Sequence, residues 1–173
     1  MDKKLEEALE RVEITYGELV NVANDILAPM FTPINATVSE INATINALSI
    51  DQIRDYILKL QLKAFEISEI KEKAALKAEL AETLQKEKFA TSFNGFEGSA
   101  AVKEKLALIE ASPETVSETL YNLVANLLKT KVDQLHRLVA ALTSILMSRM
   151  SEAKFMNAGT SVGQPGEKTY LTE

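Results

Sequence analysis

The chain has 173 residues, of which 46% are hydrophobic and 25% charged, and its 19 basic against 25 acidic side chains give a net charge of −6. It has no cysteine and one histidine, which excludes a disulfide framework, a thiolate nucleophile and a cysteine-ligated metal, and argues against a histidine-rich metal site. The acidic balance and the low aromatic content argue against a surface that grips nucleic acid everywhere, so any such contact has to be local.

The N-terminal sequence MDKKLEEALERVE is charged, and no stretch approaches 18 uninterrupted apolar residues. Together with the absence of cysteine, this predicts a cytoplasmic protein that does not act on a membrane. The length predicts one domain, or one compact unit with a helical extension.

Residues 1–28 are expected to form an acidic amphipathic helix. Apolar side chains recur along it at spacings of three and four, as in a coiled-coil seam: Leu5, Leu9, Val12, Tyr16, Leu19, Ala23 and Ile26. Pro29 and Pro33 predict the end of this helix and a hinge over 28–33, because proline lacks an amide donor and restricts the residue before it.

Residues 29–49 are expected to be a proline-containing hinge followed by a weak heptad segment. Its apolar stripe consists of Ile34, Val38, Ile41, Ile45 and Leu48. Because asparagine and threonine lower helix propensity, this segment should be helical only when it packs against a partner.

Residues 50–158 are expected to form the helical core. Ser49 and Gln52 have the spacing of a capping box, which predicts a helix from 50 to 90. Its apolar stripe begins with Ile53, Ile57, Leu60, Ala64 and Ile67 and continues with Leu76, Leu80 and Leu84. Two glycines in 91–99, one of them in an Asn94-Gly95 pair, predict a tight reversal with positive-φ positions.

A short helix over 100–111 follows, with Val102, Leu106 and Ile109 as its apolar side. Ser112 is the expected N-cap of the strongest helix, 113–156, with Pro113 in its first turn. This helix has a seam of regular four-three spacing, which we expect to join the subunits of an oligomer: Leu128, Val132, Leu135, Val139, Leu142 and Leu146. Ala158-Gly159 should end it, leaving 159–173 as a flexible C-terminal tail.

The sequence therefore predicts an all-α protein of long helices with coiled-coil-like seams, arranged as a helical hairpin or bundle. Three seams in one short chain offer more apolar stripe than a single three-helix packing can bury. We therefore expect the protein to be a homo-oligomer.

Few residues are candidates for chemistry. His136 is expected to be a surface residue, because no nucleophile lies within helical reach of it. The pairs Glu66 with Glu69 and Glu79 with Glu82 lie among lysines and are typical of a solvated face. We predict no catalytic residue, no metal and no cofactor, and hence a protein that is not an enzyme.

Two basic stretches are candidate nucleic-acid-binding sites. They contain Lys73 and Lys77 in the first, and Lys129, Lys131 and Arg137 in the second. Repeated around an oligomer, such local positive charge would form a continuous track for a phosphate backbone.

The string Leu76-Lys77-Ala78-Glu79-Leu80 resembles the Leu-Lys-Ala-Arg-Leu signature of UvsY-like recombination mediators of tailed bacteriophages. Four of five positions match, and Glu79 stands where the family has arginine. The glycine-containing break and the long C-terminal helix with Arg149 near its end are also similar. The resemblance implies a short, helical, oligomeric protein that binds single-stranded DNA and loads a recombinase onto strands covered by a single-strand binding protein, in the host cytoplasm.

Our preferred hypothesis is thus a non-enzymatic recombination mediator whose partners are itself, single-stranded DNA, a recombinase and a single-strand binding protein. Two other functions fit the same seams. One is a scaffolding coiled-coil protein of a virion or other assembly. The other is an adaptor or inhibitor that docks a helix onto a partner protein.

Overall fold

The computed structural model describes residues 3–160, with side chains from 15 to 156, and that part of the chain consists of four helices. They are α1 (Lys3–Thr44), α2 (Ile50–Gly95), α3 (Ala100–Glu110) and α4 (Ser112–Thr160). The prediction of an all-α fold is confirmed, and none of the described helices combines the length and apolar character needed to cross a bilayer.

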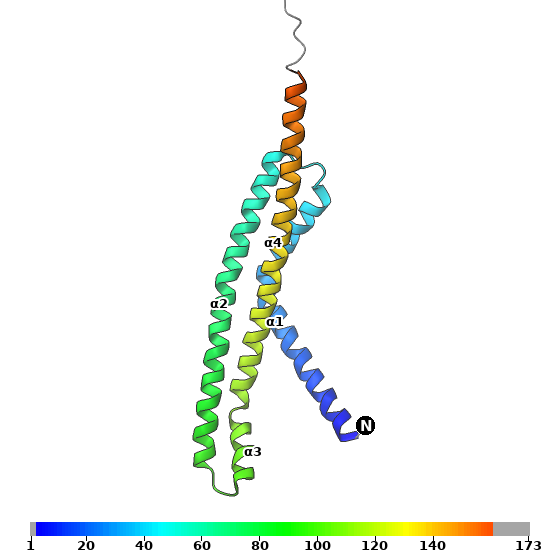
Figure 1. Cartoon of the computed structure of the whole chain (residues 1–173). Helices are drawn as coiled ribbons and strands as arrows, with labels where there is room; N and C mark the ends of the chain where they lie inside the picture. The colour runs from blue at the N-terminus through cyan, green and yellow to red at the C-terminus, as the bar shows by residue number, and fades with distance from the viewer. Residues whose placement is uncertain (1–2, 161–173) are drawn as a thin grey trace, which may run out of the picture.

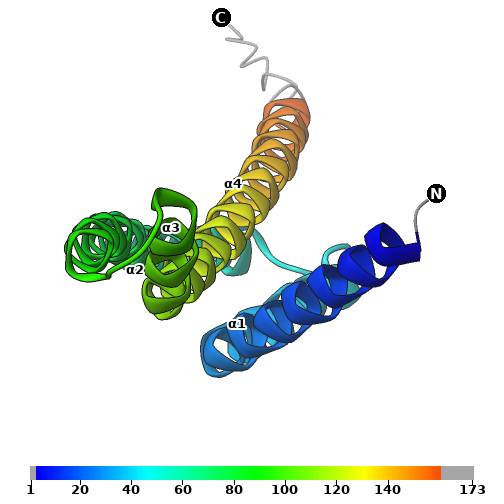
Figure 2. The same ribbon diagram turned by 90° about the horizontal axis from the view of Figure 1, so that it is seen from below.

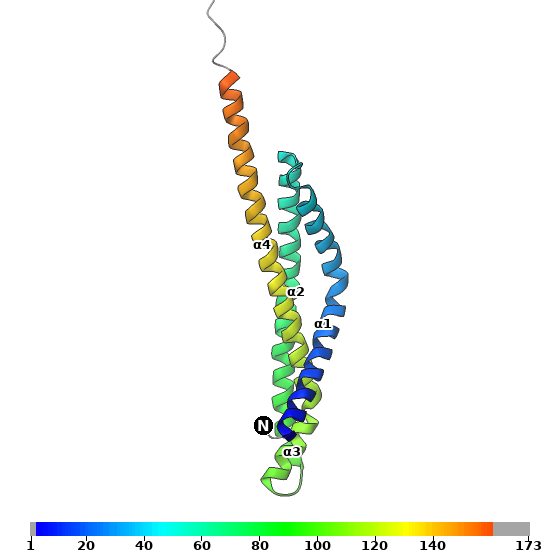
Figure 3. The ribbon, with the colours of Figure 1, turned by 90° about the vertical axis from the view of Figure 1, so that its right-hand side faces the viewer.

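The long helices α2 and α4 form an antiparallel hairpin, with α3 at its turn, and α1 lies along the hairpin (Figure 1). The N-terminal part of α1 diverges from the other two helices (Figures 1 and 2), and the end of α4 projects past the start of α2 (Figure 3). The result is an elongated three-helix body, α1 running parallel to α4.

One continuous apolar core joins the three long helices. The buried side chains are Ala23, Leu27, Ile34 and Ile41 of α1, Leu48 of the α1–α2 turn, Ile53, Leu60, Ala64, Ile67 and Ala74 of α2, and Val124, Leu128, Val132, Leu135 and Leu142 of α4. Val139 and Leu146, the other two members of the predicted C-terminal seam, are partly buried against them. The seam expected to join subunits is thus packed inside a single chain.

The predicted hinge over 28–33 is wrong, because α1 is continuous through Pro29 and Pro33. Both prolines are exposed, so the carbonyls that lose an amide partner lie on the solvent side of the helix. Leu27 and Ile34 are buried on either side of them, and this packing outweighs the local cost of proline. The weak heptad segment is helical as far as Thr44, as expected of a segment with a packing partner, and its last two apolar residues, Ile45 and Leu48, lie in the turn to α2.

The core face of α1 is also rotated from the predicted seam. Tyr16 and Ile26 are exposed, whereas Leu27, one residue further on, is buried. From Leu27 the buried positions recur every seven residues, at Ile34, Ile41 and Leu48. Ala23 is the predicted seam residue that also lies on this core face.

The start of α2 was predicted correctly, and its end was not. The Ser49 side chain accepts from the Gln52 amide (3.2 Å), and the Gln52 side chain accepts from the Ser49 amide (2.8 Å), which completes the capping box. The helix continues through Gly95 because the Phe96 amide donates to the Ser92 carbonyl. Among the described residues, only Gly98 has a positive φ, of 123°, so the reversal depends on this glycine.

The second half of α2 packs through alanines. Ala74, Ala78 and Ala81 are buried, and the predicted stripe of Leu76, Leu80 and Leu84 is exposed. Likewise α3 buries Ala107 and exposes its expected apolar side, Val102, Leu106 and Ile109. Small side chains let two helices approach closely. The alanines therefore face the neighbouring helix, although leucine is the more hydrophobic residue.

The last helix starts and ends slightly outside its predicted bounds. Ala111 alone separates α3 from α4, and Ser112 is the first residue of α4 and not its N-cap. The helix continues through Ala158 and Gly159 to Thr160. The rest of the predicted tail, 161–173, lies outside the described residues.

We predict that Leu135→Ala lowers the free energy of unfolding by about 2–5 kcal/mol, because it removes a side chain from the centre of the core. The matched control is Ile109→Ala, an exposed position on α3 that should change it by less than about 0.5 kcal/mol. Urea denaturation followed by circular dichroism measures both. Equal effects would contradict the assignment of core and surface.

Candidate functional site

The helix α2 has two apolar faces on opposite sides. One is the core face described above. The other is formed by Leu58, Leu62, Phe65, Leu76 and Leu80, which we call the outer α2 face. Since each residue of an α-helix turns about 100°, these five lie within one narrow stripe, roughly half a turn from Leu60 and Ala78. Their side chains are between 55% and 73% exposed.

Charged residues divide and border the outer α2 face. Glu69 lies at its middle and accepts a hydrogen bond from the Lys73 ammonium at 2.7 Å. This contact holds the pKa of the Glu69 carboxyl below its usual range. On one edge, Glu66 pairs with Lys63 at 2.7 Å. The predicted solvated charge face is confirmed here. Of the apolar residues beside it, Leu76 and Leu80 were predicted on the core stripe, and the sequence pattern assigned no role to the other three.

A groove of about 510 Å³ lies where α1 diverges from the hairpin. It is lined mainly by apolar side chains of the three long helices, among them Leu27, Met30, Ile70 and Leu120. Lys73 and Lys77 also line it, and the Lys77 ammonium lies 5.3 Å from the centre of the Tyr121 ring. The two lysines of the first basic stretch therefore border an apolar groove.

The residues of the string Leu76-Lys77-Ala78-Glu79-Leu80 lie on different faces of α2. Lys77 faces Tyr121 of α4, and Glu79, two residues on, lies about 200° further around α2. Glu79 consequently does not oppose Lys77 on one surface.

The second basic stretch is likewise divided between two sides of α4. Lys131 donates to the Asn35 side chain at 2.9 Å and lies 5.0 Å from the Phe31 ring, so it joins α4 to α1. Lys129 and Arg137 are exposed on other sides of the helix, and they make no ion pair with any residue that the structure describes. The five predicted binding residues do not form one surface within a chain.

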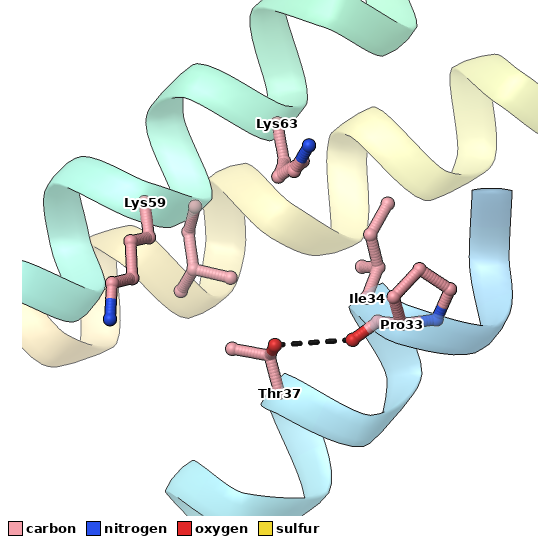
Figure 4. A pocket seen from close by; sticks show the side chains of 6 residues that line it. Pro33, Ile34, Thr37, Lys59 and Lys63 are labelled. Atoms are coloured by element: carbon pink, nitrogen blue, oxygen red, sulfur yellow. Dashed lines mark hydrogen bonds between the residues drawn. The ribbon is translucent and has the colours of Figure 1, made fainter.

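A smaller cavity of about 150 Å³ lies between α1 and α2. Lys59 and Lys63 of α2 face Pro33, Ile34 and Thr37 of α1 across it, and the Thr37 hydroxyl donates to the Pro33 carbonyl at 3.1 Å (Figure 4). Leu60 completes the lining of the cavity. It contains no acid–base pair.

Residues suited to catalysis are dispersed. His136 is exposed beside a shallow depression shared with Gln61, Phe65 and Ser68. Within residues 15–156, no group of three histidine or acidic side chains is placed to hold a metal ion. The carboxylate of Glu82, predicted to be solvated, pairs with Lys86 and raises the pKa of that lysine.

Sequence reasoning missed the structural role of Arg149. Its guanidinium donates to the Ile45 carbonyl at 2.9 Å, to the Asn46 carbonyl at 3.2 Å and to the Leu48 carbonyl. These carbonyls belong to the turn between α1 and α2, outside both helices, and the guanidinium gives them the donor that a helical amide would otherwise supply. The signal in the sequence is weak, since the contact spans about a hundred residues.

Lys88 and Glu114 close the other end of the hairpin. The ammonium lies 3.0 Å from the carboxylate, and this contact lowers the pKa of Glu114. Glu114 lies in the first turn of α4, where a negative charge is favoured by the helix dipole.

No protein-family model, curated protein or solved structure matches the chain. The resemblance to UvsY-like mediators therefore stays a prediction from the sequence.

We predict that Arg149→Met lowers the free energy of unfolding by about 1–3 kcal/mol, because three carbonyls at the α1–α2 turn lose a charged donor. Arg149→Lys should recover part of this loss, since an ammonium can reach fewer of the carbonyls at once. Thermal and urea denaturation of both variants test the role. If Arg149→Met were as stable as the wild type, the contact would contribute nothing.

Proposed function

We propose that this protein is a non-enzymatic assembly protein that acts by docking apolar helix faces onto other protein subunits. The observation that carries the proposal is the outer α2 face, an exposed apolar stripe on the helix that also forms the centre of the core. Exposed apolar side chains clustered on one face of a helix mark protein interaction sites, and here two such clusters lie on either side of Glu69. Of the hypotheses from the sequence, the scaffolding function agrees best with this surface.

The dispersal of acid–base residues and the shallow, open character of the depressions support the non-enzymatic part of the proposal. Binding of one protein helix by another needs neither a deep pocket nor a perturbed catalytic group. An elongated body with long helices offers instead a large side surface for such contacts.

The test is the oligomeric state of the full chain with and without charge on the outer α2 face. We expect light scattering of the wild type to give a multiple of 19.1 kDa. The double substitution Leu62→Asp with Leu76→Asp should weaken assembly by about tenfold or more, because it places charges in the interface. Helicity by circular dichroism should not change, since both positions are exposed.

Val116→Asp is the matched control, because it adds a charge at another exposed apolar position, in α4. It should leave the mass of the assembly unchanged. A wild-type chain that is a monomer at all concentrations would contradict the self-assembly part of the proposal.

A second candidate function is the single-stranded DNA binding of a recombination mediator. The observation that favours it is the exposure of Lys129 and Arg137 without an acidic partner among the described residues. In an assembly, each subunit would add such charges to a shared track. The proposed loading of a recombinase rests on the sequence resemblance alone.

We predict that Lys129→Gln with Arg137→Gln weakens binding to a labelled single-stranded oligonucleotide. The slope of log affinity against log salt should fall by roughly 0.7 for each phosphate contact that is lost. Lys131→Gln is the matched control and should change the slope less, because Lys131 is held by Asn35. Absence of salt-dependent binding by the wild type would leave the scaffolding function alone.

A further inference from the structure

The spacing of the outer α2 face has a symmetry of its own. Leu58 and Leu62 lie eleven and seven residues before Glu69, and Leu76 and Leu80 lie seven and eleven residues after it. Phe65 and Lys73 lie four residues before and after the same point. The leucine spacing is therefore the same when it is read in either direction from Glu69, whereas the positions four residues away hold an aromatic ring on one side and an ammonium on the other.

Such a pattern is complementary to itself in an antiparallel arrangement. A two-fold interface places the same surface patch on both subunits, so that residue i meets residue j and j meets i. If Glu69 lies at the two-fold axis, Leu62 of each copy faces Leu76 of the other. Leu58 in the same way faces Leu80. On each side of the axis, two leucines of one copy thus meet two leucines of the other.

The charges at the border agree with this register. At about 100° per residue, Glu66 and Lys73 lie on the same edge of the outer α2 face, and an antiparallel copy reverses their order along the helix. Glu66 of one copy would thus lie beside Lys73 of the other, twice in the interface. Within one chain, Glu66 pairs with Lys63 and Lys73 pairs with Glu69, so both residues are already part of the charged border. The surface is complementary in charge as well as in spacing.

We infer that the outer α2 face binds a second copy of this chain, with the two α2 helices antiparallel about a two-fold axis at Glu69. The inference rests on the proposed assembly function and specifies its partner and geometry. A different protein partner would not require the spacing to be symmetric about one residue. The two Glu69 carboxylates meet at the axis, where they fix the register at some cost in affinity, as single polar residues do in coiled coils.

Cysteine cross-linking tests the register, because the chain has no cysteine of its own. Leu62→Cys and Leu76→Cys are prepared as separate full-length variants, checked for helicity, mixed and oxidised. The mixture should form a disulfide-linked dimer that contains one of each. Leu62→Cys alone should not, because its two copies would be 14 residues apart along the helices, about 21 Å. A disulfide needs Cα atoms within about 7 Å.

Glu69→Cys should cross-link with itself, since it lies at the axis. Ala141→Cys on the exposed side of α4 is the control for random collision and should give little product. Preferential cross-linking of Leu62→Cys to itself would overturn the antiparallel register. An oligomer by light scattering without any of the expected cross-links would overturn this interface and leave the proposed assembly function standing. A monomeric wild type would overturn both.

Glu69→Leu gives an independent test by gain of affinity. It removes two facing carboxylates from the axis and makes the apolar stripe continuous, so the dissociation constant measured by sedimentation should fall by about tenfold or more. Glu79→Leu is the matched control, because it removes the same charge from α2 outside the stripe. No change for Glu69→Leu, or an equal change for both variants, would contradict the inference.

Discussion

The packing of α2 against α4 is the interaction on which the rest of the structure depends. Leu60 and Ile67 of α2 and Leu128, Leu135 and Leu142 of α4 are almost fully buried. They fix the antiparallel register of the hairpin, and α1 is positioned by the surface that the two helices form together. With this register set, Arg149 reaches the end of α1 and Lys88 reaches the start of α4.

Several features of the fold follow from local sequence, because their physical cause is local. The capping box at Ser49 acts over three residues, and the four-three spacing from Leu128 to Leu146 is a property of one helix. The sequence also predicted the helical class and the charged face around Glu66 and Glu69. Each of these predictions needed no knowledge of a partner helix.

The errors arose where a choice depended on packing between helices. Leu76 and Leu80 have a stronger hydrophobic pattern than Ala74 and Ala78, but the alanines are buried because they allow close approach. Pro29 breaks an isolated helix, and the burial of its neighbours keeps α1 intact. The same competition explains why the candidate site was incompletely predicted. The outer α2 face is visible only once the opposite face is known to be occupied.

The alanine row of α2 also implies that the hairpin is not equally stable along its length. Near the α1–α2 turn, α2 contributes isoleucine and leucine to the core. Toward Gly95 its buried residues are only Ala74, Ala78 and Ala81. Alanine buries little apolar area, so local opening costs less free energy at this end. Backbone amides of α3 and of the last turns of α2 would then exchange with solvent by fraying from the tip, while those beside Leu60 and Leu135 would exchange only through opening of the whole body. The hairpin is thus most stable near the α1–α2 turn and opens most readily at the end that carries α3.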